Sequence, residues 1–106
     1  MKRGTVVWVD LSDTTPPEMG KVRPGIVVSG TTHNEMLNTV VVVPTSSIAP
    51  EIWPLRLGVG NFAGKDSYAV IPGIRQMRKE RLRGALGQLS PEHLIALDEC
   101  LDAYLR

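Results

Sequence analysis

Short runs of Val, Ile and aromatic residues, separated by turn-forming residues, limit the fold of this chain more than any other feature. β-Branched and aromatic side chains favour strands, and Gly, Pro, Asn, Asp and Ser stand between the runs. The runs that we expect to be strands are residues 5–11, 24–29, 39–44, 53–59 and 67–72. Short strands at this spacing predict a mainly β fold, either a small barrel or a sandwich.

One helix is predicted after Ser90. Ser90 suits an N-cap and Pro91 suits the first helical position. The leucines that recur on one face of this helix are Leu94, Leu97, Leu101 and Leu105. We expect the helix to lie on the sheet, and HNEML at residues 33–37 predicts one more helical turn between the second and third strands.

Composition narrows the class of protein. A length of 106 residues, a net charge of +1 and 42% hydrophobic residues predict one globular domain over residues 1–106. The single cysteine, Cys100, excludes an internal disulfide, and the longest apolar run, residues 40–44, is far too short to span a membrane. The apolar residues before Asp10 are too few for a secretion signal, so we expect a soluble cytoplasmic protein.

Charge is unevenly placed along the chain. Residues 75–83, RQMRKERLR, hold five of the twelve Lys and Arg residues, whereas residues 84–105 hold none and carry four acidic residues. On composition alone, a solvated basic turn followed by an acidic helix face is favoured over a surface for an anionic ligand.

The order of motifs resembles a known family. RG and VVWVDL open the chain, an acidic residue precedes GKxRP, an IVVS strand and an Asn follow, and VVVVP leads into hydroxyl residues. DS, IR, RL and a terminal helix complete the series. Together these motifs resemble the MazF/PemK (Kid) toxins of bacterial toxin-antitoxin pairs over nearly the whole chain. The resemblance implies an SH3-like barrel that dimerises, cuts single-stranded RNA at short sequences without a metal or other cofactor, and is controlled by an antitoxin protein.

The chemistry of RNA cleavage gives an independent reason to look at arginine. Attack by the 2′-hydroxyl requires cations or donors for the charge that gathers on the phosphoryl oxygens. His33 and His93 are too few and too differently placed for an acid-base pair, and Asp10 and Asp13 lie in no metal-binding motif. Arginine binds phosphate through two points and keeps its charge. Arg23 is the first candidate because the following proline holds residue 23 extended.

A hydroxyl cluster is the second candidate. In PTSS, residues 44–47, the resemblance places Ser46 in the catalytic slot, although a shift of one residue would give that role to Thr45. Side chains alternate along a strand, so we expect only one of the two to face the site, with Thr45 pointing to the other face if the strand ends at Pro44. The resemblance also implies that the substrate is bound by Glu18, Lys21, Asn34, Ser47, Asp66, Ser67 and Arg75.

Other interpretations remain open from the sequence. A non-catalytic poison of the CcdB type, which acts by binding gyrase, and a plain interaction module would both suit the same barrel. The modest net charge of +1 argues against an RNA enzyme, because RNA affinity depends on neutralising phosphates. Trp53 and Phe62 could stack on bases, but a core or homodimer contact is the favoured role of Trp53.

Overall fold

The computed structural model describes residues 1–13 and 21–106, which form seven strands, two α-helices and two short 3-10 turns. The strands are β1 Thr5–Asp10, β2 Val22–Val27, β3 Thr39–Ser46, β4 Arg56–Phe62, β5 Lys65–Val70, β6 Arg75–Arg78 and β7 Leu82–Gln88. The helices are α1 Thr31–Met36 and α2 Pro91–Tyr104, and the 3-10 turns are η1 Ile71–Gly73 and η2 Lys79–Arg81. The mainly β fold with a helix following the last strand confirms the prediction.

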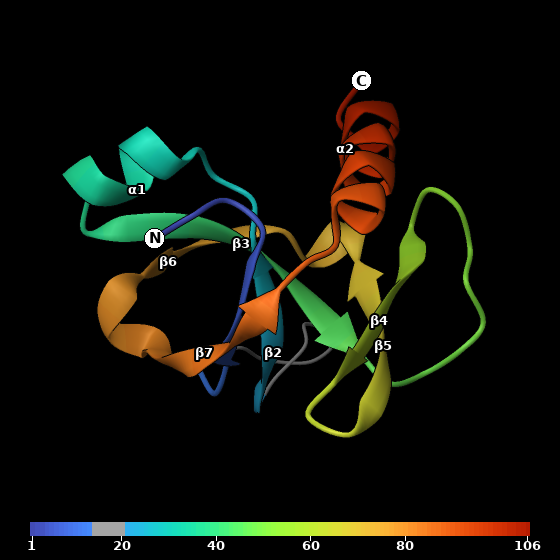
Figure 1. The fold of residues 1–106 in the computed structure, drawn as a ribbon, viewed down its shortest axis with the longest axis horizontal. Coiled ribbons are helices and arrows are strands. Elements are labelled where there is room, and N and C mark those ends of the chain that lie inside the picture. The colour runs from blue at the N-terminus through green and yellow to red at the C-terminus, as the bar shows by residue number, and fades with distance from the viewer. Residues whose placement is uncertain (14–20) are drawn as a thin grey trace.

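Strand β3 organises the sheet. The strand order is β4-β5-β3-β2-β1-β7, all pairs are antiparallel, and β6 pairs with the first half of β3. The last two residues of β3, Thr45 and Ser46, pair instead with β5. Because β3 pairs with β6 at its start and with β5 at its end, the sheet curls into a partly closed barrel (Figure 1). The β4–β5 hairpin stands out from the rest of the sheet.

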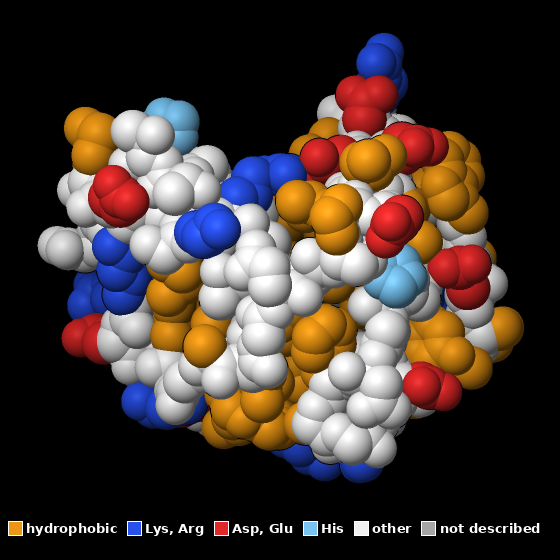
Figure 2. Space-filling view, in the orientation of Figure 1, with side chains coloured by type: hydrophobic (Ala, Val, Ile, Leu, Met, Phe, Trp, Pro, Cys, Tyr) orange, Lys and Arg blue, Asp and Glu red, His pale blue; other side chains and the backbone are white. Residues whose placement is uncertain are grey.

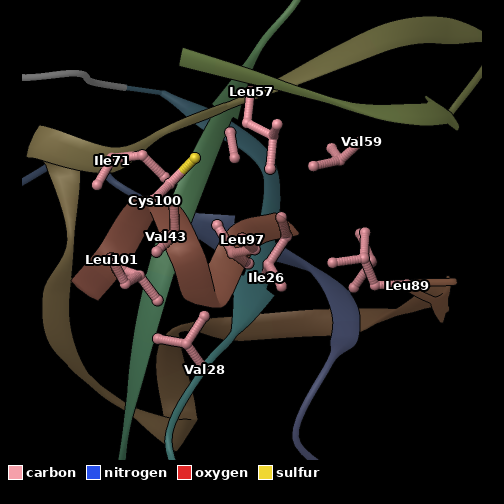
Figure 3. Close-up of a cluster of buried hydrophobic side chains, with 12 residues drawn as sticks. Ile26, Val28, Val43, Leu57, Val59, Ile71, Leu89, Leu97, Cys100 and Leu101 are labelled. Carbon is pink, nitrogen blue, oxygen red and sulfur yellow. The ribbon is translucent and has the colours of Figure 1, made fainter. Parts of the chain in front are cut away.

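Two apolar clusters fill this curled sheet. One lies between α2 and the sheet, where Leu97, Cys100 and Leu101 of the helix meet strand residues such as Ile26 and Val43 (Figure 3). The other includes Val9 of β1, Val42 of β3 and Met77 of β6. Each fully buried aliphatic side chain contributes about 1.5–3 kcal/mol. Burial of the Cys100 thiol raises its pKa, so the sulfur acts as a core atom.

Helix α2 begins as predicted but ends before its last predicted contact. The Ser90 hydroxyl accepts a hydrogen bond from the backbone N–H of His93 at 3.2 Å, and Pro91 is the first helical residue. Leu97 and Leu101 are buried and Leu94 is half-buried against the sheet. The prediction was wrong for Leu105, which is 65% exposed because the helix ends at Tyr104.

The basic segment differs from its prediction. Residues 75–83 are not a solvated turn, since they contain β6, η2 and the start of β7. Met77 explains why: it is buried against β3 while its neighbours Gln76 and Arg78 are exposed, which is the alternation of a half-buried strand. The predicted strand at residues 53–59 begins only at Arg56, and β3 continues two residues beyond Pro44.

Ion pairs fasten both ends of β1. Near the first end, the Arg3 side chain donates to the Val28 carbonyl at 2.8 Å and pairs with Asp98 of α2, which joins elements 95 residues apart. At the other end, Asp10 pairs with Arg83 of β7 at 2.8 Å. Hydrogen bonds from Ser12 and Arg83 hold the pKa of Asp10 well below its usual range.

The charged side chains are segregated in space as well as in sequence. Several Asp and Glu side chains gather around α2, and a group of Lys and Arg lies over the β6–β7 side (Figure 2).

Within residues 1–13 and 21–106, no helix is both long and apolar enough to cross a membrane.

Candidate functional site

Two prolines mark the place where β2 and β3 stop pairing. Pro44 stands opposite Gly25, the last pair in the register of these strands, and Pro24 follows Arg23 on the open side. Proline has no N–H to give to a strand ladder. Beyond the last pair the strands are joined through side chains: the Arg23 guanidinium donates to the Thr45 carbonyl at 3.2 Å, and the Thr45 hydroxyl donates to the Pro24 carbonyl at 2.8 Å.

A pocket of about 390 Å³ opens at these strand ends. Its walls come from the start of β2, the end of β3 and the β4–β5 hairpin, which lie near one another at the lower centre of Figure 1, together with Trp8 of β1. The lining residues are Trp8, Lys21, Val22, Arg23, Pro24, Thr45, Ser46, Ser47, Ile48, Phe62, Ala63, Lys65 and Ser67. The pocket therefore joins segments that are up to about 60 residues apart in the sequence.

The charged side chains described in the pocket lining are all cationic, which favours an anionic ligand. Lys21, Arg23 and Lys65 line the pocket, and no carboxylate belongs to its lining among the residues that the structure describes. Four Thr and Ser residues also line it, of which Thr45 and Ser67 donate their hydroxyl hydrogens to the backbone carbonyls of Pro24 and Lys65. A concave site with cations of one sign concentrates anionic ligands. Of the predicted residues, Arg23, Thr45, Ser46, Lys21, Ser47 and Ser67 are thus brought together.

The adjacent hydroxyl groups of Thr45 and Ser46 make different hydrogen bonds. Both Thr45 and Ser46 are buried and both line the pocket, whereas alternation along a strand predicted that only one would. The pocket lies at the end of β3, where β2 and β3 no longer pair. The Thr45 hydroxyl hydrogen goes to the Pro24 carbonyl. The Ser46 oxygen instead accepts from the Ile48 N–H at 3.1 Å, and its hydrogen has no acceptor within residues 1–13 and 21–106.

Three predicted substrate-binding residues lie outside the pocket lining. Asn34 is fully buried in α1, where its amide donates to the carbonyls of Met1 and Ser29 at 3.0 and 2.9 Å. Asp66 is exposed in the β4–β5 hairpin and accepts from Asn61 at 3.4 Å.

Arg75 is the third of these residues. Its guanidinium pairs with Asp13 at 3.2 Å, and Asp13 also pairs with Arg81 at 3.1 Å. These two arginines hold the pKa of Asp13 below its usual range. The predicted position Glu18 lies outside the described residues.

Sequence reasoning gave no role to Trp8 or to Lys65, although both line the pocket. The signal for Trp8 is its cross-strand pairing with Pro24, which becomes visible only with the register of β1 and β2. Phe62 does line the pocket, whereas Trp53, 62% exposed in the β3–β4 connection, does not.

The histidines stay apart from this site. His33 lies in α1 and His93 lies in the first turn of α2, and neither belongs to the pocket lining. Over the part of the chain that the structure describes, no three His, Cys, Asp or Glu side chains are grouped as a metal site would require.

Comparison with known proteins agrees with this architecture. The Endoribonuclease MazF of Staphylococcus epidermidis is 32% identical over 99% of this chain and 91% of its own length. The crystal structure of MazF from Deinococcus radiodurans superposes with a TM-score of 0.85 at 20% identity, over 99% of this chain and 96% of that one. A mycobacterial endoribonuclease in complex with its cognate antitoxin superposes with a TM-score of 0.82 at 23% identity, over 99% and 94% of the two chains. These two structural matches show the fold. A model of the PemK-like, MazF-like toxins of type II toxin-antitoxin systems matches residues 2–105, and the chain belongs to this family.

Proposed function

We propose that this chain is an endoribonuclease toxin that cuts single-stranded RNA in the pocket beside Arg23. The observation that carries the proposal is the composition of the pocket, in which Lys21, Arg23 and Lys65 accompany the hydroxyl groups of Ser46 and Ser47. A phosphodiester and its flanking phosphates are anions that such a site binds. Relatives of this chain are named Endoribonuclease MazF, which agrees with the proposal.

The proposed reaction is an internal displacement at phosphorus. The 2′-oxygen of one nucleotide attacks the adjacent phosphorus and loses its proton to solvent. The bond from phosphorus to the 5′-oxygen breaks, and that oxygen gains a proton from solvent. The products are a 2′,3′-cyclic phosphate and a 5′-hydroxyl, and no divalent metal takes part.

Arg23 stabilises the charge that gathers on the non-bridging oxygens. A guanidinium has five N–H donors in a fixed fork, so one group can bond to the Thr45 carbonyl and to a phosphate together. The Ser46 hydroxyl donates to the same phosphate, because its oxygen is held by the Ile48 N–H and its hydrogen points to no other acceptor in the described parts of the chain. Thr45 is a positioning residue, since its hydroxyl joins the end of β3 to the residue that follows Arg23.

The remaining predicted residues are assigned by where they lie. Lys21, Ser47 and Ser67 contact the RNA near the scissile phosphate, as does Lys65. We place Asp66 and Arg75 at the outer path of the RNA, and we keep the sequence-based assignment of Glu18. Asn34 we assign to the fold, because its amide is bonded within α1 and the chain around it.

A test of the function needs only RNA and purified protein. The protein is incubated with a mixed single-stranded RNA in EDTA, and the ends of the products are mapped. We expect cyclic phosphate and 5′-hydroxyl ends, and a rate at least about a hundredfold lower for Arg23→Ala, the usual cost of losing one donor to a transition state. Arg106→Ala is the matched control, since Arg106 follows α2 and pairs with Asp102.

The opposite outcomes are equally clear. RNA that stays intact in EDTA and is cut when Mg²⁺ is added contradicts the metal-free reaction. RNA that stays intact under both conditions favours the non-catalytic poison. Normal cleavage by a folded Arg23→Ala protein removes Arg23 from the site.

Two protein partners are part of the proposal. A cognate antitoxin lays an acidic segment over the cations of the pocket and so competes with RNA. A second copy of the chain covers exposed apolar residues of the β3–β4 connection, where Ile52, Trp53 and Leu55 are all exposed. Light scattering at micromolar concentration tests the dimer, and a monomer there contradicts it. Simultaneous binding of antitoxin and RNA contradicts the competition.

A further inference from the structure

Trp8 is the largest side chain in the pocket, and the catalytic proposal gives it no role. It is half-buried, while its chain neighbours Val7 and Val9 are core residues. In β1 it stands directly opposite Pro24 of β2 on one side and Gly84 of β7 on the other. Directly paired residues of antiparallel strands present their side chains on the same face of the sheet.

The two neighbours leave Trp8 covered unequally. Pro24 places an apolar ring beside it, but Gly84 has no side chain at all. Apart from its two chain neighbours, no residue that the structure describes has an atom within 4 Å of where a Cβ on Gly84 would be. The φ of Gly84 is +141°, a conformation that strains L side chains, so the backbone itself keeps this position open. Next to the indole there is therefore space that the sheet does not fill.

Gly84 does not itself line the pocket, but Trp8 does, and the residues that line the pocket beside Trp8 decide which ligand fits against the indole. Lys21, Arg23 and Lys65 line the same pocket, and they favour a ligand that carries phosphates. Single-strand-binding proteins combine a cationic groove for the backbone with aromatic faces on which bases stack. An acidic protein segment, such as the antitoxin proposed above, offers carboxylates to the cations, whereas a nucleotide offers a phosphate to the cations and a flat base to the indole.

We propose that Trp8 is a stacking platform for one nucleobase next to the phosphate held by Arg23. This inference rests on the proposed function and adds the residue that fixes the position of the cut. With one base held on the indole, its neighbouring phosphate is brought to Arg23 and Ser46. Stacking accepts every base because each has a π-face, so Trp8 sets the position of the RNA and other contacts read its sequence.

The test uses an oligoribonucleotide that spans a mapped cut and carries 2′-deoxyribose at the cut position, so that it binds but is not cleaved. The chain has two tryptophans, and Trp53→Phe leaves Trp8 as the only one. We expect the oligonucleotide to quench the fluorescence of this protein. Trp8→Leu should weaken binding by about 5- to 150-fold, the range for loss of one base-aromatic stack, and Trp8→Phe should restore most of it. Tyr104→Leu, at the end of α2, is the control and should bind normally.

A second ligand series keeps the test independent of folding. Each of the two nucleotides that flank the scissile phosphate is made abasic in turn. One abasic probe should bind the unmutated protein as weakly as the intact probe binds Trp8→Leu, and it should lose nothing further with that variant. An equal abasic penalty in both proteins, or unchanged fluorescence on binding, overturns the stacking role. If RNA is cut normally while this coupling is absent, only the stacking inference fails; if RNA is neither bound nor cut, the proposed function fails as well.

Discussion

Replacing Thr45 by Val removes one hydroxyl and keeps the shape of the side chain. In the structure that hydroxyl donates to the Pro24 carbonyl at 2.8 Å, and the residue is buried. Loss of a hydrogen bond costs about 0.5–1.5 kcal/mol, and more where a buried acceptor loses a partner. We expect Thr45→Val to lower the free energy of unfolding by about 1–2 kcal/mol, or roughly 4–8 °C in Tm. The cleavage rate should fall by less than about tenfold, which corresponds to about 1.4 kcal/mol.

Ser46→Ala should show the reverse pattern. Among the described residues its oxygen accepts from the N–H of Ile48 alone, and Ile48 is 66% exposed, so water can replace that bond and stability should hardly change. The rate should fall by roughly a hundredfold if the hydroxyl donates to the phosphate in the transition state. Ser46→Thr keeps the hydroxyl and should stay within about tenfold of normal.

Two measurements on the same preparations separate an effect on stability from an effect on catalysis. Urea unfolding gives the free energy, and initial rates on a single-stranded oligonucleotide give the activity. Thr45→Ser keeps the hydroxyl and controls for the loss of a methyl group. If Thr45→Val abolishes cutting without loss of stability while Ser46→Ala cuts normally, the roles are reversed. If neither variant changes the rate, the site works through Arg23 and backbone donors alone.

Other perturbations test separate features. Arg23→Lys keeps the charge but loses the two-point fork, so the rate should fall by at least about tenfold, and a normal rate would mean that charge alone is enough. Gly25→Ala would place a Cβ 3.0 Å from both Cγ atoms of Val9 and should cost about 1–3 kcal/mol in urea unfolding. Gly58→Ala meets nothing closer than 3.5 Å and is the control, so an equal loss in both would contradict the crowding argument. Asp10→Asn should destabilise the protein above the ordinary Asp pKa of 3.8, with the difference from the unmutated protein shrinking as the pH falls below it, because the folded pKa is lowered. A difference that is constant from pH 7 to pH 2 would contradict that linkage.

The apolar strands were predictable because their pattern is local. The runs at β1, β2 and β3 and the capped start of α2 follow from neighbouring residues alone. Strand β6 was missed because three of its four residues are polar and only Met77 enters the core. A strand with one solvated face and a single buried residue shows too little periodicity to be told from a charged turn.

The candidate site could be predicted where a sequence motif marks its residues. It could not be predicted where the pairing of strands brings a residue into the pocket. The resemblance to the MazF/PemK family pointed to Arg23, Thr45 and Ser46, which do line one pocket. The surroundings of Trp8 depend on which residues of β2 and β7 stand opposite it. No local sequence pattern predicts that register. Asn34 shows the limit of a motif, because a sequence cannot say which polar side chain will be buried and hydrogen-bonded within the fold.

The pairing of Arg3 with Asp98 has a consequence for the order of events during synthesis. The two residues are 95 positions apart, so at 5–20 residues per second roughly 5–20 s pass between them. Once residue 70 has been made, β2, β3 and β5, which carry most of the pocket, exist as chain, whereas β7 and α2 do not. The nascent protein therefore passes through a stage in which Arg23 and Ser46 have been made but the sheet that holds them is still open along β1. Closure of the barrel, and with it the competence of the pocket, waits for about the last quarter of these residues.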